Sequence, residues 1–75
     1  MNQYQNSGGN SGVSAYEIGT DSITVQFKDG AAYLYNNASA GSANIEKMKQ
    51  LAIAGVGLNS FISTVVKKGY ASKLR

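Results

Sequence analysis

The sequence predicts an α+β protein in which a three-stranded antiparallel sheet is followed by two helices packed on one sheet face. Apolar side chains alternate with polar ones between residues 13 and 36, as in half-buried strands. After residue 43 they recur at spacings of three and four, as on one face of a helix. A chain of 75 residues without cysteine is expected to form one small domain with no disulfide bond.

The first twelve residues, MNQYQNSGGNSG, are polar apart from one Met and one Tyr. This composition offers little apolar surface to offset the entropy that ordering would cost. We therefore expect a flexible polar tail over residues 1–12 and a single α+β domain over residues 13–75.

Three runs of residues predict the strands. In VSAYEIG (13–19), Tyr16 and Ile18 fall on one side of an extended chain and Val13 on the other. SITVQFK (22–28) alternates most regularly, and AAYLYN (31–36) is rich in aromatic residues. The turn residues between the last two runs predict an antiparallel hairpin.

The length of the hairpin turn decides where Tyr33 and Tyr35 point. A two-residue turn of Asp29 and Gly30 would place both tyrosines on the polar face of the sheet. A three-residue turn that begins at Lys28, with Gly30 at a positive φ, would place both on the apolar face. We favour the second register because a domain this small needs the apolar area of two aromatic rings.

Two helices are expected after the sheet. The first covers about residues 43–54, with Ile45, Met48 and Leu51 on one stripe, and Gly55 is a natural stop. Asn59 is the expected N-cap of the second helix, and Gly69 is expected to close it. Because FISTVV (61–66) is rich in β-branched residues, a strand remains an alternative there.

Positive charge is concentrated in the second half of the chain. Residues 1–46 carry one lysine and four acidic residues, a formal charge of −3, whereas residues 47–75 carry six basic residues and no acid, a charge of +6. Such asymmetry indicates a polyanionic partner, although helix solvation and dipole capping also explain exposed lysines. The candidate contacts are Lys47, Lys49, Lys67, Lys68, Lys73 and Arg75, with Tyr70 available for stacking.

The composition argues against an enzyme, a cofactor or a metal site. Histidine and cysteine are absent, and the four acidic residues are Glu17, Asp21, Asp29 and Glu46, which predict no close carboxylate pair. No apolar run approaches the length of a membrane span, and no signal peptide is recognisable. We expect a cytoplasmic protein with no small-molecule substrate, no catalytic residue and no bound metal or cofactor.

Motifs across residues 13–70 resemble the KTSC domain family. This family is a short module found at the C-terminus of some lysyl-tRNA synthetases and as stand-alone bacterial proteins. The resemblance is carried by VQFKDGAAYLY with its central Tyr-x-Tyr, by Ile45, Met48 and Leu51, by GVGLN, and by Ile62 and Tyr70. Two departures are the absence of the Val-Pro that tends to follow Tyr-x-Tyr, and Ser63 at a position that is often basic.

The resemblance implies the same small fold, with Tyr33, Tyr35, Gly55 and Asn59 as structural motif residues, and an association with RNA. We therefore expect a non-catalytic binding module that contacts RNA through its basic half. The alternative is a protein-interaction or homo-oligomeric assembly module that uses a sheet edge or an apolar helix face.

Overall fold

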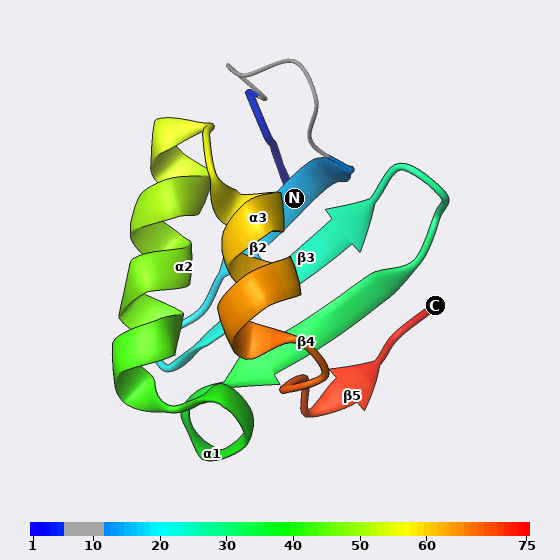
Figure 1. The fold of residues 1–75 in the computed structure, drawn as a ribbon. Coiled ribbons are helices and arrows are strands. Elements are labelled where there is room, and N and C mark those ends of the chain that lie inside the picture. The colour runs from blue at the N-terminus through cyan, green and yellow to red at the C-terminus, as the bar shows by residue number, and fades with distance from the viewer. Residues whose placement is uncertain (6–11) are drawn as a thin grey trace.

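A computed structural model describes residues 1–5 and 12–75, and Figure 1 shows the arrangement of its elements. The sheet has five strands in the order β1-β2-β3-β4-β5, and every neighbouring pair is antiparallel. The strands are β1 (Asn2–Gln3), β2 (Val13–Ile18), β3 (Ser22–Phe27), β4 (Ala32–Asn36) and β5 (Ser72–Lys73). The predicted antiparallel sheet is thus confirmed for β2, β3 and β4, and the predicted number of strands is wrong because both ends of the chain add an edge strand.

The β3–β4 turn is the three-residue turn that the sequence favours. The amide of Gly30 donates to the carbonyl of Phe27 at 3.0 Å, and the amide of Phe27 donates to the carbonyl of Ala31 at 2.7 Å. Gly30 has a φ of 95°, which a residue with a side chain adopts only at a cost. The carboxylate of Asp29 accepts from the amide of Ala31 at 2.9 Å and so fixes the turn.

This turn sets the register of the hairpin. Tyr33 pairs with Val25, and Tyr35 pairs with Ile23. Both tyrosines therefore lie on the apolar, helix-covered face of the sheet, as predicted.

A bulge in β2 changes one predicted side-chain direction. Val13 pairs with Phe27 and Ala15 with Gln26, so that Ser14 is an extra residue between them. The bulge turns Val13 onto the same face as Tyr16, and Val13 is buried. A regular strand without a bulge, as the sequence pattern predicts, would place Val13 and Tyr16 on opposite faces.

The helical part has four segments. They are α1 (Asn37–Ala40), α2 (Ser42–Ala54), α3 (Leu58–Phe61) and a single π-helical turn, η1 (Ile62–Val66), that continues α3. α1 is one turn closed by reciprocal hydrogen bonds between Asn36 and Ser39. The predicted end of α2 is confirmed, because Gly55 adopts the left-handed conformation and its amide donates to the carbonyl of Leu51 at 2.9 Å.

The ends of the second helix differ from the sequence prediction. α3 begins at Leu58, so Asn59 lies inside its first turn and is not the N-cap. The amide of Lys67 donates to the carbonyl of Ile62, and this wider turn ends the helix before Gly69 is reached. Lys67 has a positive φ whereas Gly69 does not, and the strand alternative for this segment is wrong.

The predicted flexible tail is wrong for the described residues at the N-terminus. β1 pairs with β2, and the amide of Tyr4 donates to the carbonyl of Ser14 at 3.0 Å. The ring of Tyr4 is buried, so a single aromatic side chain supplies apolar area in a segment whose average composition is polar. Residues 6–11, which the tail prediction also covers, lie outside the described residues.

Both α2 and α3 cover the same face of the sheet, and the core lies between these two layers (Figure 1). The helices contribute Ile45, Met48, Ala52, Leu58, Ile62 and Val66. The strands and the N-terminal segment contribute Tyr4, Val13, Tyr16, Ile23, Val25 and Tyr35. This confirms the two-layer arrangement expected from the sequence.

No helix in residues 1–5 and 12–75 combines the length and the apolar character that crossing a bilayer requires.

Candidate ligand groove

Four aromatic rings, those of Phe27, Tyr33, Tyr35 and Tyr70, lie close together beside the sheet near the end of η1. The ring centroids of Tyr33 and Tyr70 are 4.7 Å apart, and those of Phe27 and Tyr33 are 5.8 Å apart with an edge-on geometry. The ring centroid of Tyr35 lies 6.3 Å from that of Tyr70 and 6.5 Å from that of Tyr33. These contacts make one connected aromatic cluster centred on Tyr33.

The four rings differ in their access to solvent. Tyr35 is 2% exposed, and burial together with the neighbouring Tyr33 and Tyr70 raises its pKa to about 12. Tyr33 and Phe27 are half-buried, and Tyr70 is 36% exposed. Tyr35 is therefore part of the core, whereas the other three rings have faces or edges that a ligand can reach.

A hollow of about 300 Å³ lies over this cluster, between β4 and the helical segment formed by α3 and η1. Tyr33, Tyr35 and Tyr70 line it together with Lys67 and Lys68. Phe27, Asn59, Ile62 and Ser63 complete its wall. Aromatic and cationic side chains thus share one open cavity.

β5 brings a further cation to the cluster. Because β5 pairs with β4, Lys73 stands opposite Tyr33 in the sheet. Its Nζ lies 5.9 Å from the centroid of the Tyr33 ring, within the range of a cation–π contact.

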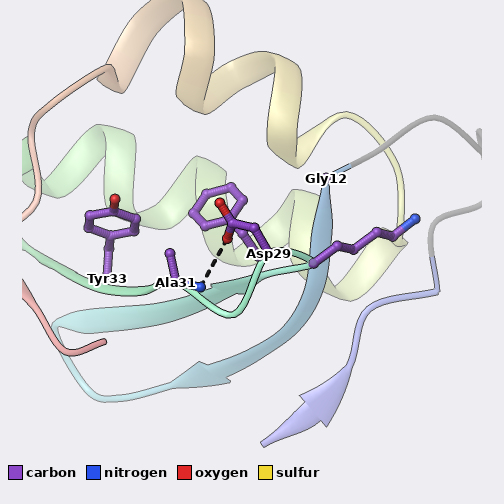
Figure 2. Close-up of a pocket in the computed structure, with 6 residues that line it drawn as sticks. Gly12, Asp29, Ala31 and Tyr33 are labelled. Carbon is purple, nitrogen blue, oxygen red and sulfur yellow. Dashed lines mark hydrogen bonds between the residues drawn. The ribbon is translucent and has the colours of Figure 1, made fainter.

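A second hollow, of about 460 Å³, adjoins the first at the β3–β4 turn (Figure 2). Gly12, Phe27, Lys28, Asp29, Ala31 and Tyr33 line it. In Figure 2 the ring of Tyr33 rises from β4, and the carboxylate of Asp29 turns back toward Ala31. Since Phe27 and Tyr33 line both hollows, we treat the two as one feature and call it the aromatic groove.

Lys67, Lys68 and Lys73 have no acidic partner in the described part of the chain, where no carboxylate lies within ion-pair distance of any of them. The one acidic residue in the lining is Asp29. The end of the groove at Lys67 and Lys68 is therefore suited to a negatively charged ligand.

Lys67 stands in an unusual backbone conformation, with φ of 54° and ψ of −119°. A residue with a β-carbon rarely adopts these angles, and such strain costs on the order of 1–3 kcal/mol. Glycine would relieve it, but the chain has a lysine here that lines the groove.

The structure divides the six bases and the tyrosine that the sequence singled out. Lys67, Lys68, Lys73 and Tyr70 come together at the groove. Lys49 lies elsewhere, with its Nζ donating to the carbonyl of Thr20 at 2.8 Å and 3.8 Å from Glu46, and its side chain is 12% exposed. Lys47, on α2, and Arg75 are exposed and do not line either hollow.

The motif residues also separate. Tyr33, Tyr35 and Asn59 line the groove, although Tyr35 is almost fully buried and also belongs to the core, and Gly55 ends α2. Sequence reasoning missed Phe27, Lys28 and Asp29 as groove residues. The three-residue turn was the available signal, because it places Phe27 beside Tyr33 on one face of the hairpin.

Comparison with known proteins gives no matching family model, no similar curated protein and no similar solved structure. The resemblance to the KTSC family therefore stays a prediction.

Proposed function

We propose that this protein is a non-catalytic module that binds single-stranded RNA in the aromatic groove. The observation that carries the proposal is the proximity of Tyr33 and Tyr70 to three lysines that no described carboxylate pairs, Lys67, Lys68 and Lys73. Stacking surfaces beside a line of cations are the two features that single-strand binding requires.

Stacking favours a single strand over a duplex. Bases in a duplex are already stacked and paired, so they cannot lie against a protein ring without being extruded. The accessible rings of Phe27, Tyr33 and Tyr70 offer room for unpaired bases, and each base stacked on an aromatic ring contributes on the order of 1–3 kcal/mol.

Charge favours a phosphate backbone as the rest of the ligand. The three lysines project from η1's end and from β5, and no described carboxylate competes for them. Three phosphate contacts on a single strand correspond to a slope of about −2 in a plot of log affinity against log salt concentration. The expected affinity is modest and strongly dependent on salt.

The strained backbone at Lys67 agrees with a binding role. Strain in a native fold is concentrated at sites where a side chain must be held in a particular direction. At Lys67 the positive φ turns the chain out of η1 and keeps the lysine at the groove. The resemblance to a module attached to some lysyl-tRNA synthetases supports RNA as the nucleic acid.

The test is a salt-dependent binding titration with a fluorescent single-stranded RNA. The Lys67→Glu, Lys68→Glu double variant should bind at least tenfold more weakly and should reduce the magnitude of the salt slope by about 1.4, the share of two of the three phosphate contacts. Lys47→Glu is the matched control, because Lys47 is exposed on α2 and lies outside the groove. Absence of binding at low salt, or an equal loss in the control, would show that the proposal is wrong.

A second candidate function is protein interaction or self-assembly. Three apolar side chains are exposed on the helical layer: Ile53 is 63% exposed, Val56 47% and Val65 51%. Exposed apolar side chains of this size can form the centre of a contact between proteins. Light scattering over a dilution series tests the homo-oligomer, and a mass that stays monomeric at all concentrations would exclude it.

A further inference from the structure

The hollow at the β3–β4 turn has a different chemistry from the rest of the groove. Its aromatic lining is Phe27 and Tyr33, and its charged lining is Lys28 and Asp29, whereas the other hollow is lined by two lysines and no acid. The carboxylate repels phosphate and offsets the charge of Lys28, so this end attracts the backbone of a nucleic acid less than the end at Lys67 and Lys68 does. It is suited to a base that presents hydrogen-bond donors.

Asp29 has acceptor capacity to spare. Its Oδ1 accepts from the amide of Ala31 at 2.9 Å, which fixes the carboxylate over the turn (Figure 2). No described residue donates to its Oδ2. An ionised carboxylate has about four acceptor sites and no donor, so the sites that no described residue uses can accept from a ligand.

Guanine matches this arrangement better than the other bases do. Its Watson–Crick edge presents two adjacent donors, N1–H and the N2 amino group, whereas adenine and cytosine present one amino group and uracil one imide N–H. A carboxylate that accepts two parallel hydrogen bonds from one planar partner gives directional recognition. The hollow of about 460 Å³ is large enough for a purine to lie against Tyr33.

We infer that the hollow at the β3–β4 turn is a base-specific subsite that selects guanine, with Asp29 accepting from the Watson–Crick edge while the base stacks on Tyr33. This inference rests on the proposed function, because the lysines at the other end of the groove hold the phosphates. The groove then has a direction: a base is read at the turn, and the backbone leaves past Tyr70 toward Lys67 and Lys68.

The test compares RNA oligomers that differ at one position. Oligo-uridine carrying one guanosine should bind about fivefold more tightly than oligo-uridine alone, the low end of the range for a two-bond base contact, because the hollow is open to water. Replacing that guanosine by inosine, which lacks the N2 amino group, should remove most of the gain. Replacing it by 7-deazaguanosine, which keeps the Watson–Crick edge, should preserve the gain.

The protein variant is Asp29→Asn. Asparagine keeps an oxygen for the amide of Ala31, so the turn is retained, but its amide presents donors toward the donors of guanine. The preference for guanosine should fall to less than twofold, while the affinity for oligo-uridine stays within about twofold. Glu17→Gln is the matched control, because Glu17 is an exposed carboxylate on β2 that lines neither hollow.

The outcomes separate the two proposals. Binding of every oligomer with equal affinity, or an unchanged guanosine preference in Asp29→Asn, would overturn the base subsite and leave RNA binding in place. If Asp29→Asn increased the affinity for all oligomers by the same factor, the base subsite would also be overturned, because the only effect of Asp29 would then be to repel phosphate. Binding of no oligomer would overturn RNA binding itself, and capture of a cationic peptide lost in Asp29→Asn would assign the hollow to a protein partner instead.

Discussion

Tyr35 and Tyr33 lie two residues apart on the same face of β4, yet they belong to different regions of the molecule. Tyr35 is 2% exposed and belongs to the closed region, the core cluster to which β3, α2, α3 and η1 also contribute. Tyr33 is half-buried in an open region with Phe27 and Tyr70. One face of β4 therefore contributes to stability at Tyr35 and to a candidate binding surface at Tyr33.

The difference comes from where the helical cover stops. The last buried residue of the helical layer is Val66, and the positive φ of Lys67 then turns the chain away. The chain comes back to the sheet at Ala71, whose amide donates to the carbonyl of Leu34 at 2.7 Å. It then continues as β5, which pairs with β4 at the sheet edge. One strained residue thus separates a packed core from an open groove.

The largest expected effect is a loss of stability in Tyr35→Ala. Truncating a buried aromatic side chain costs about 3–5 kcal/mol, a large part of the stability of a small domain. Tyr33→Ala should cost about 1 kcal/mol, since it removes ring contacts at a site that solvent already reaches. Urea denaturation measures both, and equal losses would contradict the division into a closed and an open region.

Alkaline pH should act on the closed region through Tyr35. Its pKa is raised in the folded protein to about 12 from the ordinary value of 10, mainly because burial disfavours the phenolate. The neutral phenol thus stabilises the fold fully below pH 10, and about 2–3 kcal/mol of that stability is lost as the pH rises toward 12.

Unfolding free energies measured between these two pH values check this prediction. Tyr35→Phe has no phenol to ionise and should lose less stability over the same interval. A loss as large as that of the unmodified protein would assign the alkaline effect to other groups.

Tyr4→Phe tests whether the N-terminal segment belongs to the closed region. The Tyr4 hydroxyl accepts from the amide of Leu58 at 3.3 Å in the first turn of α3, and removing it leaves that buried donor without its partner. The expected loss is about 1–2 kcal/mol in the free energy of unfolding. No loss, combined with rapid amide exchange at Tyr4, would show that the segment is not docked.

The smallest expected effect is a gain in stability at the open region. Lys67→Gly relieves the strained backbone and should stabilise the fold by about 1 kcal/mol, while weakening RNA binding severalfold. Lys68→Gly is the control, because Lys68 does not have a positive φ and should not gain stability. A Lys67→Gly variant that gains stability and keeps full affinity would separate the strain from binding.

The parts of the fold that sequence could predict are those encoded locally. The alternation in residues 22–36 and the turn at Gly30 were enough for the β3–β4 register, and the spacing of Ile45, Met48 and Leu51 was enough for α2. The two edge strands were not predictable in this way. Two-residue strands have no periodicity, and they form because Tyr4 and Tyr70 find partners distant in sequence.

The candidate site was predictable in part for the same reason. Lys67, Lys68, Lys73 and Tyr70 stand out as the basic end of the chain, and the structure brings them together. Lys47 and Lys49 share the same charge but project from α2, and sequence alone does not show that Lys49 is held by Thr20. Lys73 reaches the aromatic rings because the chain after η1 pairs with β4 as β5, and this long-range pairing is not encoded in the local sequence.

The most direct test of the central claim is an NMR titration of isotope-labelled protein with a short single-stranded RNA, with an uncharged polymer as the control. We predict chemical-shift changes that decrease with added salt and are confined to the open region, at Phe27, Tyr33, Tyr70, Lys67, Lys68 and Lys73. Amides near Tyr4 and Lys47 should not move. Shifts spread over the outer helical surface at Ile53 and Val65, or no shifts at low salt, would contradict it.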